Sequence, residues 1–459
     1  MPSPSAESEP SYVSGPNSRG TVDLLWNCFI TFGLCIWTVV HPSIIPWPRF
    51  RDQMLYKLGW LIGAILSPEL LVAVAFWQMV EAREILKLWK ENIEDSEAKT
   101  WLGMPGAFFA AMGGYTVVPP PAPPLHTGSE LNADDRPKTL VTTIRPRGFR
   151  KLLEMKIINT HIKDGTLTKA VFSRRNISDK GKADSVAKAL LCVQIAWMCI
   201  QCLGRTLEGL PVTLLEGHVL IQILFAIIAH VCWWHKPLDV SEPIQLALTV
   251  DPEVLSRLVC VGPGREEVDA RADLLTDEVS TGGFFRMFFR AAYDALSYHS
   301  PQFEAMAALF GVVNGGLHLI AWNSHFPTPA EQLLWRISAL SAGGLFPIFM
   351  LTVSGLSAED PVVRMCLNMF LSRGDHRSNW SLFAGDFSAL MGDVVDADDL
   401  WAWWLPRRVR RMLVIFIWVA LTWYIVCMLY LTIGAFLCVR NLPKGSYAIV
   451  GWTDLLPHF

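Results

Sequence analysis

The sequence predicts an all-α protein, a bundle of about seven transmembrane helices with a long polar insert between the second and third spans. The chain has 459 residues, of which 52% are hydrophobic and only 18% are charged, and its mean hydropathy is +0.32. A soluble protein carries about 25% charged residues, and a helix needs about 20 apolar residues to cross a bilayer. The recurring apolar stretches therefore indicate a polytopic membrane protein. The net charge of −3 and the lack of a basic stripe give no indication of nucleic-acid binding.

Seven apolar segments have the length of a membrane-spanning helix. They cover approximately residues 22–40, 58–80, 186–203, 212–234, 303–322, 332–354 and 411–438. The fourth ends in "VCWWHKPLDV" (231–240), where indole rings favour the headgroup level and Lys236 is expected to reach water.

These spans divide the chain into eight parts. We expect a disordered N-terminal tail (1–20), spans 1 and 2 with a helical extension (21–93), the insert (94–185), spans 3 and 4 (186–240), a loop (241–302) with an interfacial helix at 282–293, spans 5 and 6 (303–355), an acidic then basic loop (356–410), and span 7 with the C-terminal tail (411–459).

The insert carries three kinds of segment. "GMPGAFFAAMGGYTVV" (103–118) is apolar but short, which favours a re-entrant or interfacial segment. A Pro-rich linker follows at 117–137. The basic stretch 145–188 begins with an amphipathic helix that lies on the membrane or packs on the bundle.

Charge predicts the orientation of the bundle. With seven spans, the N-terminal tail shares one side with the loops after spans 2, 4 and 6, and these segments carry most of the Lys and Arg residues. Basic loops remain in the cytosol, so we expect a cytosolic N-terminus and a C-terminal tail outside or in the lumen. The sequons at Asn176 and Asn379 then lie on the cytosolic side and are expected to be unglycosylated.

Glu69 is the one ionisable residue in the apolar run from Leu58 to Val80. An acid near the middle of a span costs about 2.5–3.5 kcal/mol, and such groups usually face the bundle interior. Pro68 leaves the carbonyl of Ala64 without a helical donor. Glu69 is therefore a candidate proton donor, and the alternative is a structural hydrogen bond to the break or to a neighbouring helix.

Other polar residues in the spans are weaker candidates for a functional site. Asp23 and Glu216 stand near the starts of spans 1 and 4, where a cap or an interfacial pair is the alternative to catalysis. Asn314 and His318 are four residues apart on one face of span 5, beside Gly315 and Gly316, which close helix packing would explain.

Tryptophan is frequent, with 19 residues, and Trp77 and Trp197 are candidates for walls of a substrate site because indole faces stabilise cations. Many of these rings are expected to form interfacial belts instead. The acidic run at 392–400 lacks a second motif of its kind, so a solvated loop is favoured over a magnesium site, and no metal or cofactor is predicted.

Five blocks in order resemble a large family of fungal polytopic membrane proteins. They are "RGTVDLLWNCFITFGLCIWTVVHPSI" (19–44), "PELLVAVAFWQ" (68–78), "GAFFAAMGG" (106–114), "ISDKGKADSVAK" (177–188) and "WWHKPLDV" (233–240). The group is similar to the membrane-bound terpene cyclases of the ascochlorin and ascofuranone pathways. The resemblance implies an enzyme of the endoplasmic reticulum or another endomembrane that protonates and opens the epoxide of a prenylated aromatic without a metal.

The leading hypothesis is thus a terpene-cyclase-like isomerase that acts on a lipophilic isoprenoid in the lipid bilayer. Its proton donor is expected to be Glu69, with Glu216 and Asp23 as alternates, and Trp77, Trp197, His318 and Asn314 are expected to line the substrate. The alternatives are a transporter or channel in which Glu69 and His318 carry protons, and a non-catalytic membrane scaffold.

Overall fold

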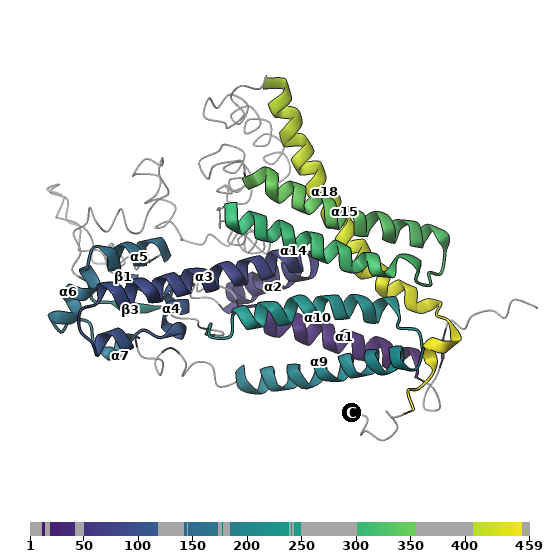
Figure 1. Ribbon diagram of the computed structural model, residues 1–459, viewed down its shortest axis with the longest axis horizontal. Helices are drawn as coiled ribbons and strands as arrows, with labels where there is room; N and C mark the ends of the chain where they lie inside the picture. Colours follow the sequence, from purple (N-terminus) through teal and green to yellow (C-terminus); the bar gives the residue numbers. More distant parts are fainter. Residues whose placement is uncertain are drawn as a thin grey trace, which may run out of the picture.

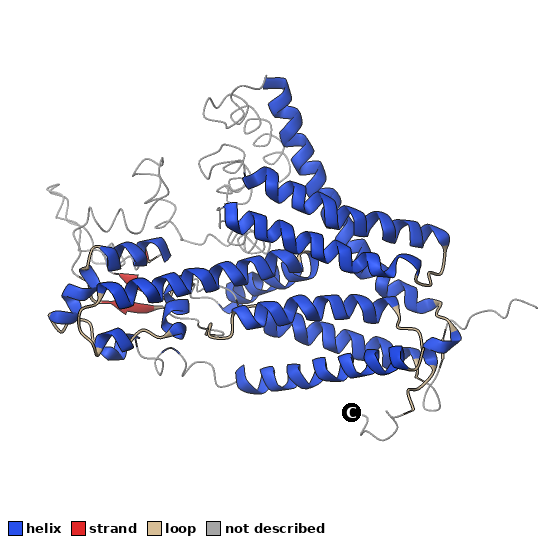
Figure 2. Ribbon diagram, in the orientation of Figure 1, coloured by secondary structure: helices blue, strands red, loops and turns tan. Residues whose placement is uncertain are grey.

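The protein is a helical bundle with a small folded unit at one end (Figure 1). The computed structural model describes residues 12–13, 19–41, 50–117, 142–144, 146–172, 177, 184–237, 240, 243–248, 301–354 and 407–451. Within them, helices account for nearly all regular structure, as Figure 2 shows. The predicted all-α membrane bundle is confirmed.

Five helices in the described residues are long and apolar enough to cross a membrane. They are Thr21–Val39 (α1), Leu190–Leu207 within α9 (Asp184–Leu207), Leu214–Cys232 (α10), Gln302–Asn323, which joins α14 (Pro301–Leu319) to η3 (Ile320–Asn323), and Val419–Arg440, which joins α18 (Arg407–Leu437) to η4 (Cys438–Arg440). Five of the seven expected spans therefore have a counterpart, four of them within a few residues, whereas the last was expected from 411 and begins at Val419. Residues 332–354 form most of the 26-residue helix α15 (Pro329–Ser354), which packs between α14 and α18 but is not one of these five.

The second expected span, 58–80, is not one helix. The chain forms α2 (Phe50–Leu66) and α3 (Pro68–Asn92), which are bent by 116° at Ser67. Proline lacks an N–H and favours the first turn of a helix, so Pro68 begins α3 instead of continuing α2. Such a bent pair is a broken span or a re-entrant loop, so the described residues hold five candidate spans, or six with the pair, compared with about seven predicted.

Both arms of the bent pair open toward the same end of the bundle. On α2, Lys57 Nζ lies 4.4 Å from the centroid of Trp37, near the end of α1. On α3, Gln78 Oε1 accepts a 2.9 Å hydrogen bond from the indole of Trp233, just after α10. Because α1 and α10 end there, the pair enters the bundle from that end and turns back at Ser67.

The insert forms a small folded unit at that end, on the continuation of α3 (Figure 1). It comprises η1 (Ala98–Thr100), α4 (Met104–Ala111), β1 (Tyr115–Val117), β2 (Thr142–Thr143), α5 (Pro146–Glu154), α6 (Ile157–Lys163) and α7 (Lys169–Phe172). Strand β1 pairs antiparallel with β2 and parallel with β3 (Ile244–Leu246). The apolar segment expected to be re-entrant or interfacial instead supplies α4, whose Phe108 and Phe109 are buried in this unit.

The contacts correct the predicted sidedness. Arg19 N donates to Tyr447 O at 2.9 Å, so the start of α1 lies beside η5 (Lys444–Tyr447) near the C-terminus. Arg205, at the end of α9, is buried and donates to the carbonyls of Pro211, Gly445, Ser446 and Ala448. The insert and β3 lie at the opposite end. The start of α1 therefore lies at the same end of the bundle as η5 and not at the end that holds the insert, because α1 runs the length of the bundle whereas the bent pair returns.

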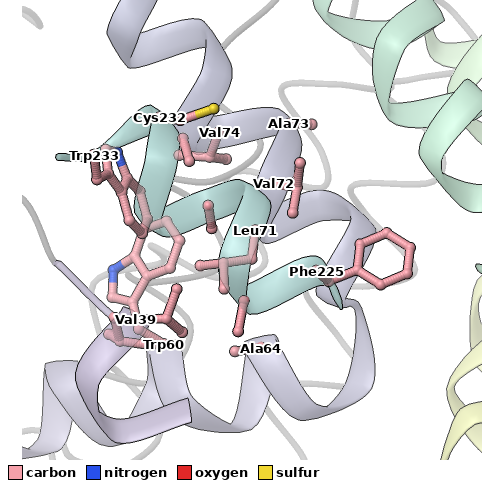
Figure 3. Packing of buried hydrophobic residues seen from close by; sticks show 14 of the residues in the cluster. Val39, Trp60, Ala64, Leu71, Val72, Ala73, Val74, Phe225, Cys232 and Trp233 are labelled. Carbon is pink, nitrogen blue, oxygen red and sulfur yellow. The ribbon is translucent and has the colours of Figure 1, made fainter. Parts of the chain in front are cut away.

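Aliphatic and aromatic side chains from α1, α2, α3 and α10 fill the interior beside the bent pair (Figure 3). Leu71, Val72 and Phe225 are among the buried residues there. A second close contact joins α14 and α15, where a Cβ on Gly315 would lie 2.3 Å from Gly343 Cα, whereas one on Gly316 would meet nothing within 4 Å. Helix packing thus explains Gly315 but not Gly316.

Four expected features lie outside the described residues. They are the Pro-rich linker, the interfacial helix at 282–293, the acidic run at 392–400, and the sequons at Asn176 and Asn379.

Candidate functional site

Glu69 lies in the first turn of α3, directly after the bend, and is fully buried. Ser67 Oγ donates to Glu69 Oε1 at 2.9 Å. The expectation that Glu69 sits in the middle of a continuous helix, below a broken hydrogen-bond ladder, is wrong, because the helix ends at Leu66 and restarts at Pro68. The acid instead stands at the N-terminus of a helix, where unpaired N–H groups favour a negative charge.

Two further neutral donors reach Glu69 from other helices. Asn314 Nδ2 on α14 donates to Glu69 Oε2 at 2.8 Å. The Tyr424 hydroxyl on α18 makes a short contact with Glu69 Oε1 and lies 3.1 Å from Leu66 O. No Lys, Arg or His in the described part of the chain forms an ion pair with this carboxyl. The acid therefore faces the interior, held by hydroxyl and amide groups alone.

A histidine pair continues from Asn314. His318 Nδ1 lies 2.9 Å from Asn314 O, and His318 Nε2 lies 3.1 Å from His218 Nδ1 on α10. A carbonyl only accepts, so His318 Nδ1 carries a proton and Nε2 of the neutral ring accepts from His218 Nδ1. His218 Nε2 is then an acceptor, buried and without a hydrogen-bond partner among the described residues.

Aromatic rings border this chain of polar groups. Phe346 lies 5.0 Å from Tyr424 and Trp335 lies 5.9 Å from His318, between ring centroids. The Trp335 indole also donates to His318 O at 3.2 Å. These rings make the surroundings of the polar groups apolar, which strengthens the electrostatic interactions between them.

The two alternate acids are caps. Glu216 Oε2 accepts from Thr213 N at 2.9 Å and Thr213 Oγ1 at 2.8 Å, and the Glu216 carboxylate pairs with Arg19. Asp23 Oδ2 accepts from Gly20 N at 3.2 Å in the first turn of α1. The structure places neither beside Glu69, and both contacts match the structural alternative given for them.

The two candidate tryptophans lie elsewhere. Trp77 packs edge-on against Phe303, with ring centroids 6.2 Å apart. Trp197 is half-buried on α9, which packs mainly on α1 and α10. The structure therefore joins Glu69, Asn314 and His318 from the expected set and leaves out Trp77, Trp197, Glu216 and Asp23.

Three participants were missed by the sequence patterns: Ser67, His218 and Tyr424. His218 offered a signal, because His218 and Gln222 stand four residues apart on one face of an apolar helix. Tyr424 gave no such signal in the sequence, because a tyrosine in an apolar helix is common and its partner Glu69 is 355 residues away.

A second polar cluster lies where α1 and α10 end. Lys236, expected to reach water, is buried: Nζ donates to Gln78 Oε1 at 2.8 Å and to His41 O, and lies 4.5 Å from the Trp233 centroid. Burial lowers the pKa of Lys236 well below its usual value. His41 packs against both Trp233 and His230 in this cluster.

Comparison with known proteins gives one family. No curated protein and no solved structure matches the chain. Residues 1–269 and 288–459 match a family described as a family of unknown function (DUF8562). These ranges cover nearly all of the sequence, so the chain belongs to this family, DUF8562, whose members are of unknown function.

Proposed function

We propose that the protein is a proton-coupled membrane transporter in which Glu69 is the proton-binding group. The observation that carries this proposal is the position of Glu69 at the break between α2 and α3. Transporters commonly place their ion and substrate sites at discontinuous helices, where helix ends and unwound backbone supply polar groups inside the membrane. An ionisable residue at such a place is expensive to bury and usually functional.

The partners of Glu69 suit a carboxyl group that changes its protonation state. As a carboxylate, it accepts from Ser67, Tyr424 and Asn314. When it is protonated, its own O–H has acceptors in the hydroxyl oxygens of Ser67 and Tyr424, because a hydroxyl both donates and accepts. Both states are then hydrogen-bonded without a bound cation, so a proton is the coupling ion that this site fits best.

The histidine pair lies one contact away from Glu69. Asn314 donates its side-chain N–H to the acid, and its backbone carbonyl accepts from His318, which contacts His218. An amide N–H only donates, so the pair supports the polar surroundings of Glu69 and is not a proton path from it. His218 lies in the second turn of α10, near the end of the bundle that holds Arg19 and Glu216. The bent pair opens toward the opposite end. Glu69 thus lies inside the bundle, between its two ends.

A pH-jump measurement tests the proposal without a known solute. Purified protein in liposomes on a solid-supported electrode should give a transient current when the pH changes, as protons enter the buried site. Glu69→Gln should abolish the current. Glu304→Gln is the matched control, since Glu304 is another buried carboxyl, in the first turn of α14, and its current should persist. A current that survives Glu69→Gln, or disappears equally in both variants, contradicts the proposal.

Terpene cyclisation is the second candidate. The ring neighbours Phe346 and Trp335, together with the resemblance to membrane-bound terpene cyclases, favour it. In this reaction protonated Glu69 would give its proton to the epoxide oxygen of a prenylated phenol. The C–O bond would open, the cation would cyclise, and loss of a proton to a base such as His218, whose Nε2 has no partner among the described residues, would leave a product of unchanged mass.

Both functions use the protonated form of Glu69, and transport is preferred because the acid lies at a break between two helices, where transporters place their ion sites. Incubation with an epoxy-farnesylated phenol distinguishes the two. A same-mass product that Glu69→Gln abolishes would establish the cyclase. If neither product nor pH-jump current depends on Glu69, a non-catalytic scaffold is the remaining alternative.

For its location we propose the endoplasmic reticulum or another endomembrane, with the insert in the cytosol. The insert carries many Lys and Arg residues close to α3 and α9, and basic loops remain cytosolic. Since the N-terminal segment lies at the opposite end of the bundle, this orientation puts both termini in the lumen, the reverse of the expected N-terminus.

A further inference from the structure

Three buried polar atoms on α10 and α14 have no hydrogen-bond partner among the described residues. They are His218 Nε2, Gln222 Nε2 and Asn314 Oδ1, and each of these side chains is at most 4% exposed. An unpartnered buried polar group costs about 1–3 kcal/mol, so three in one place call for a physical explanation.

The register of the two helices brings these atoms together. Helices α10 and α14 lie side by side (Figure 1). His218 contacts His318, and two turns further along α10 Phe225 packs edge-on against Phe310 at 6.4 Å. The residue numbers rise on one helix as they fall on the other, so the helices are antiparallel.

Gln222 and Asn314 therefore face each other. Gln222 is one turn after His218, and Asn314 is one turn before His318, so the two side chains stand opposite one another between the histidine pair and the phenylalanine pair. Gln222 Nε2 offers N–H donors, and Asn314 Oδ1 offers an acceptor. These two groups do not bond each other, although their chemistry is complementary.

We infer that a hydroxyl group binds between Gln222 and Asn314, accepting from the first and donating to the second. Its source is a water molecule or the hydroxyl of a lipophilic ligand such as a phenol. A water molecule has two hydrogens to donate, whereas a phenol has one. This inference extends the proposed function by naming the group that stands beside Glu69, because Asn314 Nδ2 is bonded to that acid.

The test uses the full-length protein in lipid nanodiscs. A buried hydroxyl gives a distinct infrared O–H band that moves on exchange into D₂O. Exchange into H₂¹⁸O moves the band only if the oxygen belongs to water. Gln222→Met should remove the band in either case. Gln194→Met is the matched control, since Gln194 sits in another span with a known partner, Thr31 Oγ1 at 2.8 Å, and should leave the band unchanged.

A second experiment tests whether the hydroxyl belongs to a ligand. Phenol should raise the Tm of the wild-type protein, whereas its methyl ether, anisole, which cannot donate, should not, and Gln222→Met should lose the phenol effect.

The inference is overturned if Gln222→Met changes neither the band nor the phenol response. It is also overturned if that variant melts at a higher temperature than wild type, because that result means the amide had no partner. A pH-jump current that depends on Glu69 without any hydroxyl band separates the failure of this inference from failure of the proposed function.

Discussion

Asn314 Nδ2 donates to Glu69 Oε2 at 2.8 Å across 245 residues of sequence. This bond joins the interior of α14 to the bend between α2 and α3, and it gives a neutral partner to an acid that pairs with no cation in the described part of the chain. The backbone carbonyl of the same asparagine accepts a hydrogen bond from His318 Nδ1. One residue therefore links the acid to the histidine pair.

The Tyr424 hydroxyl should stabilise the bend. Tyr424→Phe keeps the ring against Phe346 but removes the hydroxyl that contacts Glu69 Oε1 and lies near Leu66 O. We expect a loss of about 1–3 kcal/mol in the free energy of unfolding, because a buried acceptor loses its partner. Thermal melts of the protein in detergent measure this loss of stability. Tyr430→Phe on the same helix, which gives up one hydrogen bond to Glu331 O, should cost less. Equal shifts in the two variants would contradict the special role of Tyr424.

Two adjacent glycines on α14 should differ sharply when replaced. Gly315→Ala forces a Cβ against the backbone of Gly343, and overpacking of this kind costs about 1–3 kcal/mol. Gly316→Ala meets nothing within 4 Å and should be neutral or stabilising, since alanine favours a helix by up to about 1 kcal/mol. Melting temperatures of the two variants decide this, and a destabilised Gly316→Ala would disprove the assigned packing.

Lys236 should make stability depend on pH. Burial lowers its pKa below the unfolded value of about 10.4, so between the folded and unfolded pKa values the unfolded chain binds more protons. The contribution of this group is greatest above pH ~10.4 and is lost as pH falls through the folded pKa. Its other near neighbours, His41, His230 and Trp233, carry no negative charge to offset this.

The measurement compares melts at neutral pH and near pH 10 for wild type and Lys236→Met. Wild type should gain stability relative to the variant as the pH rises. A variant with the same pH dependence as wild type would show that Lys236 does not titrate in this range.

The contacts at the two ends of the bundle predict the topology. Epitope tags at the N- and C-termini should both be protected from protease in sealed microsomes, and a tag in the linker at 118–141 should be cleaved. The pairing of Arg19 with Tyr447 and of Arg205 with Gly445 requires the termini to share a side. One protected and one exposed terminus would contradict the fold.

Part of the site could be predicted from the local sequence. Glu69 was identifiable because one acid in an apolar run is conspicuous, and Asn314 and His318 shared a face because they are four residues apart. His218 and Tyr424 reach these residues from α10 and α18, across 100 and 355 residues, and no local pattern encodes such pairings. Trp77 and Trp197 were selected by residue type alone, and packing placed them elsewhere.

The sequence by itself determined that this is a helical membrane protein and approximately where five of its spans run, because hydrophobic length is a property of each segment alone. Only the tertiary structure decided that the second apolar segment turns back on itself and which groups surround its acid. The direction of a chain after a proline, and the neighbours of a buried carboxyl, depend on helices distant in sequence that pack around them.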